Sequence, residues 1–444
     1  MFKKLAGLKQ KFSPNFQQIV GNTAWLLGDK FLRMGLGLLV GVWVARYLGP
    51  GGFGILHYAI AFVTLFTTLA TMGLNNIIIR DVVRKPHEKD EVMGTAFVLK
   101  LLGGFFISIL AVSLIYLFKP DDRQTLFLVA IISTGMIFRA FDVIEFWFQA
   151  QVKSKYIIFA KTSGYLLINI VKIIAIYIQA PISVFAGILS AEIVLGAVGL
   201  VIVYQWQGYL LNAWSWSRKR AKSLLTESWP LIISGIVITI YMRTDQIMLG
   251  EMVGDSAVGI YSATVRISEM WYLIPNTLVK SVFPKVVQAK EISQKIYYER
   301  LQQLFYSVAV LSYSVAIPIT FFSTQIVTLI YGDNYAAAGP VFSIHIWSGL
   351  FVSLGVARGP WLITEGLTKF SAASTATGSV INVVLNYFLI AKYSIIGAAI
   401  ATVISQIFAS YVCHIFLPKT RIIFMQQTKA LVPIHLLIDS ISKK

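Results

Sequence analysis

Long runs of apolar residues, separated by short polar stretches, follow one another along the whole chain. Twelve of these runs reach the roughly 20 residues that an α-helix needs to cross the hydrocarbon core of a bilayer. Lipid offers the backbone no hydrogen-bond partners, so runs of this length are predicted to form helices. The expected spans cover residues 23–47, 54–80, 93–118, 125–149, 156–178, 182–205, 228–249, 256–282, 303–330, 337–364, 370–391 and 395–417. The pattern therefore predicts an all-α polytopic membrane protein.

Weak internal repeats divide these spans into two sets of six. Gly49–Ile55 follows the first span, and the similar segment Gly254–Ile260 follows the seventh. Asn169 in the fifth span matches Asn382 in the eleventh. Six spans in each half keep both halves in the same orientation, which predicts parallel repeats with a site between them.

Five regions are expected along the chain: an amphipathic lead-in at 1–22, a first half at 23–205, a basic linker at 206–226, a second half at 227–418 and a tail at 419–444. The lead-in lacks the continuous apolar core of a signal peptide. Its basic residues instead suggest a segment that lies on the membrane surface.

The composition agrees with a membrane protein, because 57% of the 444 residues are apolar and only 13% are charged, against about 25% in a typical globular domain. The net charge is +18. If the N-terminus is cytoplasmic, the inner segments hold 23 Lys and Arg residues and the outer loops hold three, Lys119, Arg123 and Lys392. This asymmetry predicts that both termini are cytoplasmic. It also explains the basic balance without nucleic acid and lets the inner surface attract anionic lipids.

The residues that build common cofactor sites are missing from the sequence. The single Cys413 excludes an internal disulfide and a cysteine metal cluster. The five histidines have no paired metal-binding spacing, and no GxxxxGK[ST] nucleotide-binding motif occurs. We therefore expect no metal, no cofactor and no ATP site, so any transport would be driven by a gradient.

Charged residues interrupt several of the apolar runs, most densely between Glu227 and Pro284. Arg243, Asp245, Arg266 and Glu269 all lie inside or at the edge of spans there. Each charge facing lipid at the bilayer centre would cost about 2.5 kcal/mol or more. These side chains are therefore expected to face one another or a watered cavity.

Basic residues inside the spans outnumber the acidic ones. We interpret this excess as a path for an anionic group such as a pyrophosphate or a uronic acid, because Arg donates bidentately to such groups. The predicted path residues are Arg33, Arg139, Arg266, Arg243, Lys30 and Lys100. The alternative is that some of these residues form helix-bridging ion pairs or reach toward the interfaces.

Several strings resemble those of oligosaccharide flippases in the multidrug/oligosaccharidyl-lipid/polysaccharide exporter superfamily. They are Tyr241–Gly250, Val258–Ala263, Ile274–Pro275, Val282–Pro284, Tyr331–Tyr335, Ile396–Ser405, Gly73–Asn75 with Arg80, and Asn382 with Asn386. The resemblance implies a transporter, not an enzyme, that moves a polyprenyl-pyrophosphate-linked oligosaccharide to the outer leaflet by alternating access. It further implies a multi-pass protein of a prokaryotic cytoplasmic (inner) membrane that serves surface polysaccharide biosynthesis.

A Na⁺ or H⁺ gradient is one expected energy source, and Asp29, Asp142, Asp245 or Glu269 could bind the ion. Three other functions stay open at this point. A multidrug or cation antiporter of the same superfamily should show an acidic rather than a basic bias. A peptidoglycan-precursor flippase generally carries fourteen spans. A membrane polysaccharide polymerase or ligase would need a larger outer loop with paired catalytic residues.

Overall fold

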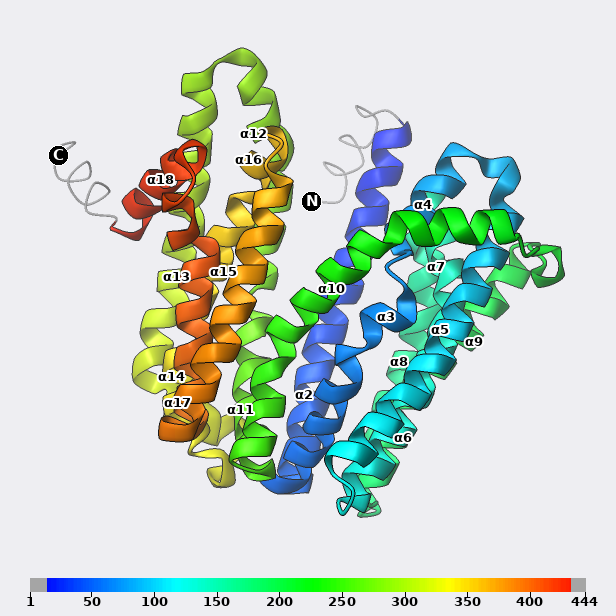
Figure 1. The fold of residues 1–444 in the computed structure, drawn as a ribbon, viewed down its shortest axis with the longest axis horizontal. Helices are drawn as coiled ribbons and strands as arrows, with labels where there is room; N and C mark the ends of the chain where they lie inside the picture. Colours follow the sequence, from blue (N-terminus) through cyan, green and yellow to red (C-terminus); the bar gives the residue numbers. More distant parts are fainter. Residues whose placement is uncertain (1–13, 433–444) are drawn as a thin grey trace, which may run out of the picture. The chain divides into compact units, whose positions relative to one another are not determined.

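The computed structural model describes residues 14–432, and within this range the chain contains α-helices and short 3₁₀ turns but no β-strand (Figure 1). Parts of the expected lead-in and tail, residues 1–13 and 433–444, lie outside the described residues. The helices are α2 (Pro14–Leu65), α3 (Thr67–Thr71), α4 (Asn75–Arg84), α5 (Lys89–Phe118), α6 (Arg123–Phe138), α7 (Asp142–Ala150), α8 (Ser154–Tyr177), α9 (Ile182–Trp206), α10 (Arg218–Met252), α11 (Asp255–Met270), α12 (Leu273–Ile292), α13 (Gln294–Tyr331), α14 (Ala338–His345), α15 (Ser348–Ala357), α16 (Gly359–Thr364), α17 (Thr368–Ser410) and α18 (Arg421–Leu431). The 3₁₀ turns are η1 (Pro86–Glu88), η2 (Arg139–Phe141), η3 (Leu211–Ala213), η4 (Asp333–Tyr335), η5 (Val412–Ile415) and η6 (Pro418–Thr420).

The predicted all-α membrane fold is confirmed. Within the described range, nine helical segments are long and apolar enough to cross a membrane. Helix α2 holds the first expected span and the start of the second, and α17 holds the eleventh and most of the twelfth. Within each of these helices the two spans are divided by a break with positive φ, at Gly49 (φ 66°) and at Ser394 (φ 51°). Eleven expected spans thus overlap the nine segments, and the remaining one, 256–282, is divided between α11 and α12.

Two expected spans are less regular than their hydrophobic runs suggest. The span 54–80 is interrupted at Met72 and Gly73, which both have positive φ. The span 125–149 changes at Arg139 from α6 to the turn η2 before α7 begins. Such breaks are tolerated inside a bundle where other groups satisfy the freed backbone atoms.

The chain forms two compact units. Unit 1 holds the described residues up to Tyr47 together with Ala59–Thr239, and unit 2 holds Leu48–Tyr58 together with the described residues from Ile240 onward. The expected linker 206–226 lies within unit 1, and α10 continues across the division.

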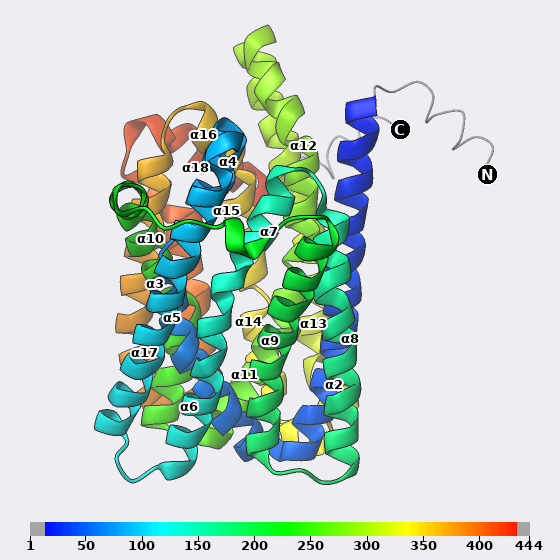
Figure 2. The same ribbon diagram turned by 90° about the vertical axis from the view of Figure 1, so that its right-hand side faces the viewer.

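Unit 1 is a bundle in which α5, α6, α8 and α9 pack as neighbours (Figure 2). Its core includes Leu74, Ile78, Val143, Phe148 and Tyr204, which are buried. Large apolar side chains, among them Phe105, Phe106 and Phe159, remain exposed on its helices. Apolar surface of this kind suits a bundle surrounded by lipid.

Charged side chains hold the start of α10 against α4, η1 and α5 within unit 1. Arg80 contacts Glu227 with a nitrogen–oxygen distance of 2.6 Å, and Arg220 forms ion pairs with Glu88 and Glu91. The preceding loop is also held, because the backbone nitrogen of Ser215 donates to the backbone oxygen of Asp90. The segment between the two expected halves is therefore packed against the other helices of unit 1.

Unit 2 has its own core, centred on Tyr297, Phe305, Leu354 and Trp361 from α13, α15 and α16. The amphipathic helix α18 packs against α13, where Tyr313 donates to the backbone oxygen of Leu431.

The two glycine repeats seen in the sequence lie against each other in unit 2. A Cβ atom added to Gly54 would overlap the backbone oxygen of Asp255, and one added to Gly259 would overlap the backbone oxygen of Pro50. Each blocking oxygen belongs to the residue four positions before the opposite glycine, so the contact is reciprocal. Gly at both positions lets the two helix starts touch backbone to backbone.

Candidate functional site

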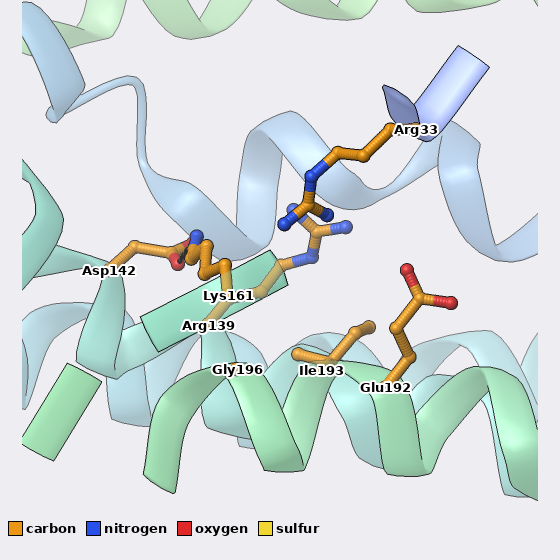
Figure 3. A pocket seen from close by; sticks show the side chains of 7 residues that line it. All are labelled: Arg33, Arg139, Asp142, Lys161, Glu192, Ile193 and Gly196. Carbon is orange, nitrogen blue, oxygen red and sulfur yellow. Dashed lines mark hydrogen bonds and ion pairs between the residues drawn. The ribbon is translucent and has the colours of Figure 1, made fainter. Parts of the chain in front are cut away.

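Unit 1 contains a cavity of about 150 Å³ that is lined mainly by charged side chains (Figure 3). Its lining residues are Arg33, Arg139, Asp142, Lys161, Glu192, Ile193 and Gly196. They come from α2, η2, α7, α8 and α9, so residues distant in sequence converge there. Three cations around a pocket within membrane-spanning helices form an environment suited to an anionic group.

Arg33 is held by contacts on several sides. Its Nε lies 3.0 Å from both carboxylate oxygens of Asp29, and its Nη2 donates to the hydroxyl of Thr162 at 3.2 Å. The guanidinium also lies over the ring of Tyr165, at 4.8 Å from its centroid. Because the Tyr165 hydroxyl donates to the backbone oxygen of Arg33, the ring and the helix are fixed together. These contacts orient the guanidinium in advance of any ligand.

Lys161 joins α8 to α7 through a pair of carboxylates. Its Nζ is 2.9 Å from Asp142 Oδ1 and also contacts Glu145 Oε2. Asp142 and Glu145 stand one turn apart on α7, so a single ammonium group can reach both. Close by, Lys172 pairs with Glu192 at 3.4 Å.

Arg139 and Lys100 differ from the other cations of this region. The Nε of Arg139 is buried and, among the described residues, has no hydrogen-bond partner. Lys100 is 1% exposed, and its Nζ also lacks a hydrogen-bond partner there. That ammonium lies 4.7 Å from the centroid of the Phe146 ring, a cation–π contact. Lys100 is therefore a buried charge that does not line the cavity itself.

Unit 2 contains a smaller cavity, of about 50 Å³, with a different chemistry. Its lining residues are Tyr241, Met242, Asp245, Gln246, Tyr261, Val265, Glu269, Tyr272, His345, Thr402 and Gln406. Two of these are acids, and no Lys or Arg is among them. This pocket is suited to a cation or a proton rather than to an anion.

Asp245 is the most buried acid of this second pocket, at 6% exposure. Its Oδ2 accepts hydrogen bonds from the hydroxyls of Tyr261 at 2.5 Å and Thr402 at 3.0 Å. Its Oδ1 is buried and has no hydrogen-bond partner in the described part of the chain. An unsatisfied buried carboxylate oxygen is rare and calls for a specific explanation.

A chain of polar side chains extends from this pocket into α17. Tyr241 lies 3.4 Å from the hydroxyl of Ser405, to which Asn382 donates at 3.4 Å. Asn386 in turn donates to Asn382 Oδ1 at 3.0 Å. Asn382 and Asn386 are fully buried. The series of hydrogen bonds therefore links the pocket to buried side chains of α17.

The structure groups some of the predicted site residues and separates others. Arg33, Arg139, Asp142 and Asp29 meet at the unit 1 cavity, and Asp245 and Glu269 line the unit 2 cavity. Lys30 is exposed and Lys100 is buried behind the cavity, so neither lines it.

Arg243 and Arg266 are partly buried and do not line the unit 2 cavity. Their charges instead act on the ring of His57, within the segment Leu48–Tyr58 of the same unit.

The site residues predicted from the sequence did not include several residues that the structure brings to the two cavities or their contacts. They are Lys161, Thr162, Glu192, Tyr261 and Thr402. Lys161 is separated from Asp142 by 19 positions and Thr402 from Asp245 by 157, so no local spacing relates these pairs. Helix packing alone makes them neighbours.

The helical fold and the polar cavities inside its bundles define a polytopic membrane protein of the transporter class. The chain belongs to the polysaccharide biosynthesis protein family, whose model matches residues 19–290. A second family model, MatE, matches residues 230–388.

Known proteins support the same classification. The chain is 26% identical over 415 residues to "Probable flippase AglR" of Haloferax volcanii, covering 89% of this chain and 83% of that protein. It has the fold of an inward-facing multidrug resistance MATE family transporter of the MOP superfamily, with a TM-score of 0.72, 16% identity, and 89% and 95% of the two chains covered. The lipid II flippase MurJ in an inward closed conformation gives a TM-score of 0.69 at 16% identity, with 94% and 93% covered.

Proposed function

We propose that this protein flips a polyprenyl-pyrophosphate-linked oligosaccharide from the cytoplasmic to the outer leaflet, for the synthesis of a surface polysaccharide. The observation that carries the proposal is the cationic cavity of unit 1, built by Arg33, Arg139 and Lys161 inside membrane-spanning helices. Membership of the polysaccharide biosynthesis protein family supports this substrate class. The lipid tail would stay in the bilayer while the hydrophilic part crosses by alternating access.

In this proposal the unit 1 cavity binds an anionic group of the passing substrate. Arg33 is already oriented by Asp29 and Thr162, so little side-chain freedom is lost on binding. Arg139 contributes a donor, its Nε, that has no partner among the described residues. Guanidinium groups bind phosphate and carboxylate oxygens in a defined plane, whereas Lys161 adds a point charge.

Transport would be coupled to Na⁺ or H⁺ at Asp245 in unit 2. Of the four acids that sequence reasoning proposed for this role, Asp29 and Asp142 are engaged in ion pairs with Arg33 and Lys161. Asp245 has a buried oxygen, Oδ1, without a hydrogen-bond partner in residues 14–432, and its other oxygen accepts from two neutral hydroxyls. Glu269 lines the same cavity and would be the second acid of the ion site.

The protein would lie in the cytoplasmic membrane of a prokaryote, with both termini in the cytoplasm. The basic residues of the inner segments would then lie near anionic lipids.

Reconstitution into proteoliposomes tests the proposal directly. A polyprenyl-pyrophosphate oligosaccharide is placed in one leaflet, and its appearance in the other is followed with and without a Na⁺ or H⁺ gradient. We expect protein-dependent movement that one of the two gradients accelerates. Export of a cationic dye with no glycan movement would instead establish a drug antiporter, and a lengthened glycan would establish a polymerase.

A further inference from the structure

Nine charged side chains lie in or beside the unit 1 cavity and are here called the charge cluster. They are Asp29, Arg33, Lys100, Arg139, Asp142, Glu145, Lys161, Lys172 and Glu192. Five are cations and four are acids, so the formal charge of the charge cluster is +1. We propose that the cavity selects a glycan group with a single negative charge, such as a uronate carboxylate or a phosphodiester, and that Lys100 sets this preference.

The local pairings show where the unbalanced charge resides. Arg33 is matched by Asp29, and Lys172 is matched by Glu192. Lys161 contacts two carboxylates, those of Asp142 and Glu145, and this trio has one negative charge in excess. Arg139 and Lys100 make no ion pair among the described residues. Their two positive charges outweigh the single excess negative charge of the trio, which leaves one positive charge unbalanced.

An unbalanced charge away from water is unfavourable. A ligand that neutralises this charge gains more electrostatic interaction energy than it would from the same charge in water. One negative charge would bring the charge cluster to zero. A pyrophosphate, with at least two negative charges, would leave the charge cluster negative. The electrostatics therefore favour a singly charged group of the glycan at this cavity over the pyrophosphate of the carrier.

The two arginines of the cavity come from different elements, Arg33 from α2 and Arg139 from η2, and Figure 3 shows both side chains at the cavity. Two like charges that share a pocket destabilise each other, and an anion bound there relieves this repulsion. The cavity of about 150 Å³ has room for an acidic group and part of one sugar ring, but not for an oligosaccharide.

Lys100 would act through its charge and not by contact. It is 1% exposed, its ammonium lies on the Phe146 ring, and the charges of Asp142 and Arg139 act on it directly. It is thus a positioning residue behind the cavity, and its removal would change the net charge without changing the lining. This role rests on the proposed flippase function but makes a separate prediction about selectivity.

The test uses matched polyprenyl-pyrophosphate trisaccharides that differ in one sugar, with glucose, glucuronate or glycerol-phosphate-substituted glucose in that place. In proteoliposomes with the wild-type protein, we expect one or both singly charged substrates to move about tenfold faster than the glucose form at limiting substrate. The Lys100→Met variant should lose this preference while still moving the glucose form. The double variant Lys100→Met/Glu145→Gln restores the +1 balance and should recover the preference.

Lys392→Met is the control variant, because it changes an exposed residue outside the charge cluster, and it should leave the preference for singly charged substrates unchanged. Equal rates for all three substrates in wild type would overturn the inference and leave the flippase intact. Equal loss of every substrate in Lys100→Met, without rescue by Glu145→Gln, would give Lys100 a purely structural role and also overturn it. No movement of any substrate would overturn both proposals.

Discussion

Gly54 and Gly259 block each other's side-chain positions, since each would place a Cβ on a backbone oxygen of the opposing segment. Helix starts that approach this closely are held by backbone contact, which small residues permit and larger ones prevent. The contact joins α2 after its break to the start of α11, both within unit 2.

Substituting either glycine should therefore destabilise unit 2. Gly259→Ala should lower the free energy of unfolding by at least about 1–3 kcal/mol, the usual penalty for overpacking, because backbone and not a flexible side chain must move. The melting temperature of the detergent-purified protein measures the change. Gly51→Ala is the matched control, since its added Cβ would meet only the hydroxyl of Ser256 at an ordinary 3.6 Å. Equal melting temperatures for the two variants would show that the contact is not tight.

Arg139 should be needed for transport, because its Nε, which has no hydrogen-bond partner within residues 14–432, is among the donors that the unit 1 cavity offers to an anion. We expect Arg139→Gln to lower the flipping rate by about tenfold or more, the effect of losing one hydrogen bond to a charged group. Lys30→Gln serves as control because Lys30 is exposed and does not line the cavity. A similar loss in both variants would point to a general effect of surface charge.

Asp245 should carry the coupling ion and not the glycan. The Asp245→Asn variant keeps the shape and can still accept from Tyr261 and Thr402, but it removes the charge that binds Na⁺ or the group that binds H⁺. Stimulation by the gradient should disappear, whereas slow movement without a gradient should persist. Asp333→Asn, at an exposed acid of η4, should behave like wild type. Retained stimulation in Asp245→Asn would assign the ion to another group.

Arg358, a buried arginine with 4% exposure, should serve stability. It donates to His414 Nε2 at 2.8 Å, to Ser374 Oγ at 3.0 Å and to Cys413 Sγ at 3.2 Å. A lysine cannot reproduce this planar set of donors. Arg358→Lys should lower the free energy of unfolding by about 1–3 kcal/mol, because buried polar groups lose their partners. Arg300→Lys, at an exposed residue that donates to Gln303 Oε1 at 3.5 Å, should have little effect on the melting temperature.

Much of the fold could be predicted from hydrophobic runs alone, because the requirement to hydrogen-bond the backbone in lipid leaves a helix as the only solution for each run. The breaks were harder to predict. Gly49 precedes a proline and signals a break, but Ser394 adopts a positive φ with neither glycine nor proline beside it. The switch to η2 at Arg139 likewise follows a stretch with no proline.

The candidate sites were predictable only in part. Their position within apolar runs marked Arg33, Arg139 and Asp245 as charges that need partners or a watered cavity. Arg139, Asp142 and Glu145 follow one another at three-residue spacing, yet both acids contact Lys161 from another helix. Such pairings depend on which helices become neighbours, and that information is not contained in the spacing along one helix.

The distribution of the chain between the units has a consequence for how the protein can be divided. Residues 48–58 lie between the first two spans expected in the first half but belong to unit 2, while residues 227–239 begin the expected second half but belong to unit 1. Each expected half therefore lacks a piece of one compact unit, as the protomers of a domain-swapped dimer do. Cutting the gene at the linker would therefore yield two incomplete fragments, each dependent on the other for its missing piece.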